Sequence, residues 1–384
     1  MIAATRPAID LVVGARPNFM KAAPLIDVLR AVHPDWKVQI VHTGQHYDER
    51  MSDLFFRQLA MPSPAVNLGV GSGTQAQQLA KLLLALEEQF LSDKPDLVIV
   101  FGDVNSTLAT ALIASRLLIP LAHVEAGLRS FDRTMPEEIN RTLTDSLSAL
   151  LFTTERSANE NLRREGVPSE RIHFVGNLMI DTLLKHLAQA ETLQMTRTFG
   201  LEPKRYGVLT LHRPSNVDDE QALGRILTAI RQIAAEFPIV FPVHPRAQSR
   251  IHSMVSRSDS NLRMVAPLGY LEFLGLMRDA AVVLTDSGGI QEEAFILRVP
   301  CVTLRENTER PVTLTGGANV LVGADSRRIV AEALAAFRGK RVLPASAPEN
   351  WDGKAAHRIV SVLEGWFAAA LDQDPEVRMQ GQRT

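Results

Sequence analysis

Short apolar runs alternate along this chain with longer stretches in which apolar residues recur every three or four positions. The first pattern is typical of buried strands and the second of amphipathic helices, so the sequence predicts an α/β fold with parallel sheets. The strands expected in the first half are Ile9–Val13, Val38–His42, Leu97–Phe101, Leu121–Val124, Leu150–Thr153 and Ile172–Val175. Those expected in the second half are Gly207–Leu211, Ile239–Pro242, Leu262–Val265, Ala281–Leu284, Cys301–Leu304 and Val320–Val322.

The two sets of strands are separated by a segment near Gly176–Arg205, which carries a helical pattern at Met179–Arg197. We therefore expect two doubly wound, Rossmann-like domains that face each other across a cleft. The expected divisions are a first domain at 1–177, a second at 178–354, a helix at Ala355–Leu371 that packs back on the first domain, and a tail at 372–384. Ligands of such sheets bind beyond the carboxyl ends of the strands, so the residues there are the candidates for function.

One such strand end lies in Ala280–Ala294, A-A-V-V-L-T-D-S-G-G-I-Q-E-E-A, where a buried strand and a small turn precede a helix expected at Ile290–Leu297. The free N–H groups and the dipole of a helix N-terminus bind phosphate, and glycine lets an anion approach the backbone. The expected contacts of a nucleoside diphosphate are Ser287, Gly288 and Gly289 for the phosphates, with Glu292 or Glu293 for the ribose. An ordinary turn with a solvated acidic face is the alternative.

Carboxylates follow neighbouring strands of the first half. Asp103 and Glu125 each come just after a predicted strand, and Glu137 lies near the start of the next helix. Carboxylates that converge at one sheet edge are suited to general acid–base chemistry, because one removes a proton while another delivers it. Glu137 also has a structural interpretation, since Thr134-x-x-Glu137 matches a capping box and Arg141 is spaced for an i,i+4 ion pair.

Cations and histidines stand at other strand ends. Arg16 and Lys21, in G-A-R-P-N-F-M-K, lie near a helix start, where the dipole disfavours cations, so we expect them to face a ligand anion rather than solvent. His212 and His244 end two strands of the second half. A protonated His212 would neutralise a departing phosphate oxygen, and Arg310 would bind a diphosphate through two hydrogen bonds.

Composition narrows the possible partners and the cellular location that the sequence suggests. The 384 residues are 46% hydrophobic and 22% charged, as in globular proteins, and the net charge of −2 gives no electrostatic reason to expect nucleic acid or an anionic membrane as partner. The single cysteine, Cys301, excludes an internal disulfide and fits a reducing cytoplasm. The N-terminal residues show no signal-peptide pattern, and no apolar run reaches the roughly 18 residues of a membrane span.

Cofactor motifs are weak. Gly71–Ala76 spells G-S-G-T-Q-A, but it does not follow the first strand and no acidic residue stands about 20 positions later, so nicotinamide binding is not expected. No histidine or cysteine cluster has the spacing of metal ligands, so no metal is expected.

Taken together, these loops resemble those of the non-hydrolysing UDP-N-acetylglucosamine 2-epimerases. The matching segments are G-A-R-P-N-F-M-K, F-G-D, H-V-E-A-G-L-R, P-E-E-I-N-R-T-L-T-D, F-V-G-N, H-R-P-S-N-V, P-V-H-P, T-D-S-G-G-I-Q-E-E-A, E-R-P and T-G-G, between Gly14 and Gly323. The resemblance implies two Rossmann-like domains of the glycosyltransferase-B type, a homodimer, and a reaction without a cofactor.

That reaction would be the reversible conversion of UDP-N-acetylglucosamine to UDP-N-acetylmannosamine, supplying precursor for surface polysaccharide. UDP is eliminated across C1–C2 to give a 2-acetamidoglucal and then added back with the proton on the opposite face of C2. By matched position, the implied catalytic residues are Asp103, Glu125, Glu137 and His212. The implied substrate contacts are Arg16, Lys21, Arg141, His244, Phe273 near the uracil, Ser287, Gly288, Gly289, Glu293 and Arg310.

Two departures from the family pattern bear on regulation and substrate. Some bacterial members bind a second UDP-N-acetylglucosamine as activator, and the residues here that match that site are Gln45, His46 and Arg213. Asp48 replaces an expected glutamine and Gly69–Thr74 supplies no arginine, so activation by substrate is not expected. The loop Arg129–Met135 is also short, which affects the choice of 2-acetamido sugar.

Four other functions fit the same sequence less well. A hydrolysing 2-epimerase would release free sugar, and a relative would act on a UDP-2,3-diacetamido uronic acid sugar. A glycosyltransferase of the same fold would need one catalytic base rather than several carboxylates. A nucleotide-sugar-binding module would need none.

Overall fold

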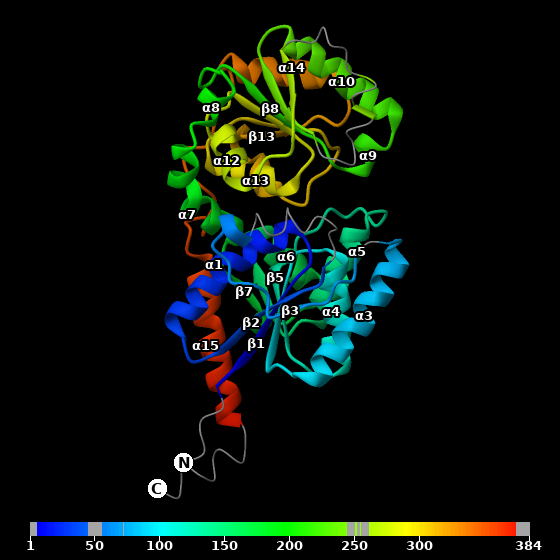
Figure 1. The fold of residues 1–384 in the computed structure, drawn as a ribbon, viewed down its shortest axis with the longest axis vertical. Helices are drawn as coiled ribbons and strands as arrows, with labels where there is room; N and C mark the ends of the chain where they lie inside the picture. Colours follow the sequence, from blue (N-terminus) through cyan, green and yellow to red (C-terminus); the bar gives the residue numbers. More distant parts are fainter. Residues whose placement is uncertain are drawn as a thin grey trace, which may run out of the picture. The chain divides into compact units, whose positions relative to one another are not determined.

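The structure is a computed structural model that describes residues 6–44, 56–71, 73–243, 250–251, 254 and 261–373. Its internal contacts divide the chain into two compact units, drawn in Figure 1. The first unit joins the residues up to Thr182 with those from Glu349 onward, and the second is Leu183–Pro348. The boundaries lie a few residues from those that the sequence suggests.

The first unit is built on a parallel sheet with the strand order β3-β2-β1-β4-β5-β6-β7. Its described strands are β1 (Ala8–Val13), β2 (Lys37–His42), β3 (Val66–Asn67), β4 (Leu97–Phe101), β5 (Leu121–Ala126), β6 (Leu150–Thr153) and β7 (Ile172–Phe174). Its described helices are α1 (Arg16–Val32), α3 (Gln75–Ser92), α4 (Asn105–Arg116), α5 (Pro136–Leu147), α6 (Arg156–Arg164) and α15 (Ala355–Gln373). The central strand β4, Leu-Val-Ile-Val-Phe, is wholly buried, as expected for a strand covered on both faces.

The second unit contains a parallel sheet with the order β10-β9-β8-β11-β12-β13. Its described strands are β8 (Gly207–Thr210), β9 (Ile239–Pro242), β10 (Leu262–Val265), β11 (Val282–Thr285), β12 (Cys301–Thr303) and β13 (Asn319–Leu321). Its described helices are α8 (Met195–Thr198), α9 (Pro214–Val217), α10 (Glu220–Ala234), α12 (Tyr270–Arg278), α13 (Gly288–Ile296) and α14 (Ser326–Phe337), and α7 (Leu178–Thr192) crosses the boundary between the units. Helices α10 and α14 pack together over one apolar core, where Phe237 stacks on Phe337.

The predicted α/β class with doubly wound parallel sheets is confirmed. Every predicted strand is present, with its ends within two residues of those expected. The sequence missed β3, because two residues among prolines and polar side chains carry no periodicity. It also predicted one helix at Met179–Arg197, whereas the structure has α7 and α8, separated where Gln194 takes a left-handed φ of 47°.

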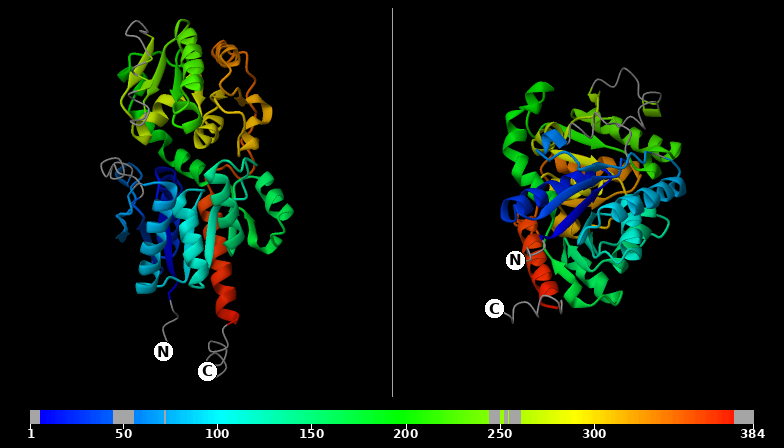
Figure 2. Two further views of the ribbon diagram at one scale, coloured as in Figure 1. Left: turned by 90° about the vertical axis from the view of Figure 1, so that its right-hand side faces the viewer. Right: turned by 60° about the horizontal axis from the view of Figure 1, so that its bottom comes forward.

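Helix α15 belongs to the first unit and runs alongside it in Figures 1 and 2. Asp181 of α7 accepts hydrogen bonds from the first N–H groups of α15, those of Ala355 and Ala356, at 3.1 and 2.8 Å. The carboxylate thus caps a helix from a distant part of the chain. Among the residues that the structure describes, no helix is long and apolar enough to cross a membrane.

Candidate functional site

In the first unit, polar side chains gather where β1, β4 and β5 end. Lys21, one turn into α1, forms an ion pair with Glu125 of β5, and the two side chains are each only 7% exposed. A Cβ at Gly102, directly after β4, would lie 3.2 Å from Lys21 Nζ and 3.8 Å from Glu125 Oε2. The glycine therefore leaves room for the pair. We expected Lys21 to face a ligand anion, and the structure places it against the carboxylate of the predicted acid–base group.

Glu125 stands on irregular backbone. Val124 and Ala126 pair with consecutive residues of β6, so Glu125 is the extra residue of a β-bulge. Its φ of +72° lies in the left-handed region, which is costly for a residue other than glycine. A bulge changes the direction in which a side chain points. Here the Glu125 carboxylate lies near the carboxyl end of β5, where it pairs with Lys21.

Asp103 pairs with Arg141 of α5, and Arg141 also forms an ion pair with Glu138. This arrangement corrects the structural interpretation of Glu137. Helix α5 begins at Pro136 with Met135 as N-cap and no side-chain cap, and Thr134 bonds to Asp132, so there is no capping box.

The expected i,i+4 pair is also wrong, because Arg141 takes Glu138 at i,i+3 instead. Glu138 further accepts hydrogen bonds from the backbone N–H groups of Ser130 and Phe131, at 3.0 and 2.9 Å. Glu138 is thus the structural glutamate and fastens the loop before α5. Its neighbour Glu137 is half-buried, and no hydrogen bond or ion pair holds it among the described residues.

In the second unit, α13 begins at Gly288, two residues earlier than predicted, with Ser287 as N-cap. The glycines are therefore the first residues of the helix rather than part of the turn. Ser287 is partly exposed, and its hydroxyl makes no cap bond to the helix. The Ser287 N–H donates to Thr285 Oγ1 at 3.0 Å. The first N–H groups of a helix have no partner within it, so the N–H groups of Gly288 and Gly289, with the Ser287 hydroxyl, are the donors expected of a phosphate site.

Arg310 lies against this helix start. A Cβ at Gly288 would meet the tips of the Arg310 and Glu309 side chains, so a residue larger than glycine would have to displace them. Arg310 forms ion pairs with Glu309 and, at 2.9 Å, with Glu292. Glu292, one of the two glutamates expected to contact a ribose, is buried and pairs with Arg310 in this structure.

Glu309 is surrounded by cations. Besides Arg310, it contacts Arg305 at 2.7 Å and Arg213 at 3.7 Å. Burial alone would raise the pKa of Glu309, but the neighbouring Arg310 and Arg305 hold it well below its usual range. The guanidinium groups of Arg310, Arg305 and Arg213 thus lie around Glu309 beside the helix N-terminus. Guanidinium groups and a helix N-terminus are both common contacts of bound anions.

His212 is oriented by a buried carboxylate. Asp286 lies 2.8 Å from His212 Nδ1 and accepts hydrogen bonds from the backbone N–H of His212 and Arg213 and from the Asn216 amide. Burial raises the pKa of Asp286, but the bonds from His212 more than offset this and the pKa lies below its ordinary value. Asp286 is thus ionised and keeps a proton on Nδ1, while the imidazole remains 48% exposed.

The remaining predicted substrate contacts either lie outside the described residues or show only their burial. Gln45, His46 and His244 lie outside the described residues. Phe273 on α12 is almost wholly buried, as is Glu293 on α13, and Arg16 is partly exposed at the first position of α1.

Sequence reasoning missed Asp286, Glu309 and Asn18. Asn18 accepts from the N–H groups of Gly14 and Ala15 and donates to Phe101 O at 2.9 Å, joining the ends of β1 and β4. A signal was present for Asp286, since it directly follows β11, just as Asp103 comes just after β4.

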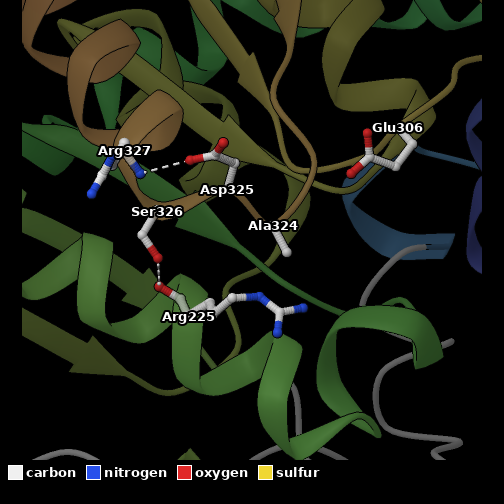
Figure 3. Close-up of a pocket in the computed structure, with 6 residues that line it drawn as sticks. All are labelled: Arg225, Glu306, Ala324, Asp325, Ser326 and Arg327. Atoms are coloured by element: carbon white, nitrogen blue, oxygen red, sulfur yellow. Dashed lines mark hydrogen bonds between the residues drawn. The ribbon is translucent and has the colours of Figure 1, made fainter.

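An open pocket elsewhere in the second unit contains none of the predicted residues. It is lined by Arg225, Glu306, Ala324, Asp325, Ser326 and Arg327 (Figure 3). Ser326 Oγ donates to the backbone oxygen of Arg225 at 2.9 Å, and Asp325 caps α14 by accepting from the Arg327 N–H. Ser326 and Asp325 thus have structural roles at the start of α14, and no ligand is needed to account for them.

The fold and the two clusters define a class: proteins built from two Rossmann-like units, with carboxylates at strand ends of one unit and arginines beside a helix N-terminus of the other. The family model for UDP-N-acetylglucosamine 2-epimerase matches residues 30–364. The chain belongs to this family of isomerases, as the sequence motifs predicted.

Two relatives and one solved structure show what the chain is similar to. A UDP-N-acetylglucosamine 2-epimerase of Methanocaldococcus jannaschii is 43% identical over 92% of this chain and 98% of its own length. A UDP-2,3-diacetamido-2,3-dideoxy-D-glucuronate 2-epimerase of Pseudomonas aeruginosa is 42% identical over the same shares. The crystal structure of the Methanocaldococcus enzyme in complex with UDP-GlcNAc and UDP is similar, with a TM-score of 0.86 over 93% of this chain and 99% of that one, at 42% identity.

Proposed function

We propose that this protein interconverts UDP-N-acetylglucosamine and UDP-N-acetylmannosamine by eliminating UDP and adding it back. The observation that carries the proposal is the pair of clusters: carboxylates at the strand ends of the first unit and a cationic helix N-terminus in the second. Relatives that share over 40% of the sequence are named for 2-epimerisation of UDP-sugars.

The chemistry explains why both clusters are needed. The hydrogen on C2 is poorly acidic, so it leaves together with the diphosphate: a base takes the proton, the C2–H electron pair forms the C1=C2 bond, and the C1–O pair departs with UDP. Re-addition reverses these movements, with the proton delivered to the opposite face of C2. One residue must accept the proton and another return it, which fits the group Asp103, Glu125 and Glu137.

The second cluster stabilises the leaving group. The N-terminus of α13, Ser287 and Arg310 supply donors and positive charge to the diphosphate, whose negative charge grows as C1–O breaks. His212, with Nδ1 held by Asp286, has Nε2 to present a proton to the departing oxygen. No redox cofactor takes part, because the elimination and the re-addition leave the overall oxidation state unchanged.

Proton NMR in heavy water tests this function. UDP-N-acetylglucosamine incubated with the protein should give UDP-N-acetylmannosamine with deuterium at C2. Free N-acetylmannosamine and UDP would instead identify a hydrolysing enzyme, and no change in the sugar would indicate a transferase or a binding protein.

A UDP-2,3-diacetamido uronic acid sugar is the second candidate substrate, favoured by the 42% identity to the Pseudomonas enzyme named for that activity. The ratio of kcat/KM for the two UDP-sugars decides between them. A higher value for the uronic acid sugar would replace UDP-N-acetylglucosamine as substrate but leave the elimination mechanism in place.

We also propose a homodimer. Large apolar side chains are exposed on α3 and α5 of the first unit: Leu84, Leu91, Ile139 and Leu143. Apolar surface of this kind is typical of contacts between subunits. Sedimentation analysis should show a species of twice the chain mass, and Leu84→Asp with Leu143→Asp should convert it to monomer.

A further inference from the structure

The buried pair His123 and Asp145 lies directly behind the proposed acid–base group. His123 is on β5 and Asp145 on α5, and both side chains are fully enclosed. Nδ1 of His123 is 2.6 Å from Asp145 Oδ1, and its Nε2 is 2.7 Å from the backbone oxygen of Gly102. Neither residue was singled out from the sequence.

The hydrogen bonds fix the orientation of the His123 ring. A carbonyl oxygen only accepts, so Nε2 must donate to Gly102. The Asp145 carboxylate also accepts from the Gly127 N–H at 3.1 Å and pairs with Arg129 at 2.7 Å, so it is ionised and Nδ1 donates to it as well. Both ring nitrogens of His123 are therefore held, one by the Asp145 carboxylate and the other by the Gly102 carbonyl.

Glu125 lies between the two points that Asp145 holds. Asp145 binds the His123 side chain two residues before it on β5 and the Gly127 N–H two residues after it. The left-handed φ of Glu125 and its bulge lie between these bonds. A strained backbone conformation persists only where surrounding interactions hold it in place. Here the buried Asp145 carboxylate binds residues on both sides of Glu125.

The same pair also reaches the second carboxylate. Through Nε2, His123 binds the carbonyl of Gly102, the residue directly before Asp103. The turn that carries Asp103 is thereby tied to the strand that carries Glu125. We propose that His123 and Asp145 are positioning residues that hold Glu125 and Asp103 in register for proton transfer at C2. This inference rests on the proposed function.

The experiment compares Asp145→Asn with wild type and with Asp10→Asn. Asp10 is a matched control, since it is another buried carboxyl group of the same unit, on β1, and its partner Gln39 belongs to no proposed site. Three quantities are measured on each protein: kcat for UDP-N-acetylglucosamine, the Kd for UDP, and the thermal unfolding midpoint.

Asp145→Asn should lower kcat by at least about tenfold, since displacement of a reacting group by about 1 Å costs up to roughly 10²-fold. The Kd for UDP should change by less than about twofold, because the proposed diphosphate site is in the other unit. Asp10→Asn should keep wild-type kcat. If Asp145→Asn does not fold, His123→Gln, which keeps one donor, provides the same comparison.

Wild-type kcat in the folded variant would overturn the inference. So would an equal loss of kcat and of UDP affinity, or an equal loss in Asp10→Asn, because either would indicate general destabilisation. Failure of the proposed function itself would be visible separately, as wild-type protein that does not epimerise the sugar.

Discussion

Two adjacent glutamates at the start of α5 differ in their burial and in their hydrogen bonds. Glu138 is buried and holds Arg141 and the preceding loop, whereas Glu137 is half-buried and takes no part in those bonds. We predict that Glu137→Gln lowers turnover by about 10²-fold or more, as expected for an acid–base group, and leaves the unfolding free energy unchanged.

Glu138→Gln is the matched variant and should instead lower the unfolding free energy by about 1–3 kcal/mol, because it leaves a buried arginine short of a charged partner. Chemical denaturation of both variants measures the unfolding free energy, and steady-state kinetics measures turnover. Normal turnover in Glu137→Gln would remove this residue from the acid–base group.

Asp10 gives the clearest pH dependence at the residue scale. Burial raises its pKa from 3.8 to about 6, with the hydrogen bond from Gln39 opposing the shift and nearby Asp93 adding to it. The folded protein thus holds this proton more tightly than the unfolded chain does. The contribution to stability is fully present below pH 3.8 and is lost as the pH rises through about 6, amounting to about 3 kcal/mol.

Asp10→Asn cannot ionise, so the difference in unfolding free energy between it and wild type should change by about this amount between pH 3 and pH 7. Urea denaturation at several pH values measures it. A difference that stays constant with pH would show that Asp10 titrates normally.

The limits of sequence reasoning are also visible at this scale. Asp103, Glu125 and Ser287 were predicted because each stands at a strand end, and the structure places them there. The partners of these residues come from distant segments: Asp286 binds His212, and Asp145 binds His123. Nothing local marks such partners, and a local pattern misled at Glu137, where the tertiary pairing of Arg141 with Asp103 and Glu138 overrides a plausible helix cap.

At the scale of elements, the fold was predictable because buried strands are short apolar runs with clear ends. The first residues of helices were harder to predict. Gly288 and Gly289 predict a turn, but they are the first residues of α13. The reason for glycine at this position is tertiary: Arg310 occupies the space that a side chain at 288 would fill.

Gly288→Ala should therefore displace Arg310 from the helix start and weaken UDP binding. Loss of one charged contact, about 1.5–3 kcal/mol, corresponds to roughly 10- to 100-fold in Kd. Gly365→Ala on α15 is the control, because a Cβ there meets no atom within 4 Å and should only stabilise the helix, by about 1 kcal/mol. Unchanged affinity in Gly288→Ala by calorimetry would place the diphosphate elsewhere.

At the scale of the whole molecule, the proposed function assigns one part of the reaction to each unit, and regulation by substrate would need a further site. A second nucleotide-sugar carries a diphosphate, which requires a cation of its own. Arg213, one of the residues considered above for a second site, belongs to the arginine cluster around Glu309 that is proposed for the first diphosphate. The sequence between Asn67 and Gln78 contains no arginine or lysine.

We therefore predict hyperbolic saturation curves and full reverse turnover from UDP-N-acetylmannosamine alone. Progress curves with and without a trace of UDP-N-acetylglucosamine check this. A lag that the trace abolishes would show that substrate activates the enzyme.

Elimination and re-addition of UDP require cleavage of the bond between C1 and the diphosphate oxygen during every turnover. UDP-N-acetylglucosamine labelled with ¹⁸O in the bridge between C1 and the β-phosphorus measures this cleavage directly by phosphorus NMR. If UDP departs and returns, the β-phosphate can rotate, and the label should spread into its non-bridging positions as UDP-N-acetylmannosamine forms. Epimerisation with all of the label retained in the bridge would contradict elimination and re-addition as the mechanism.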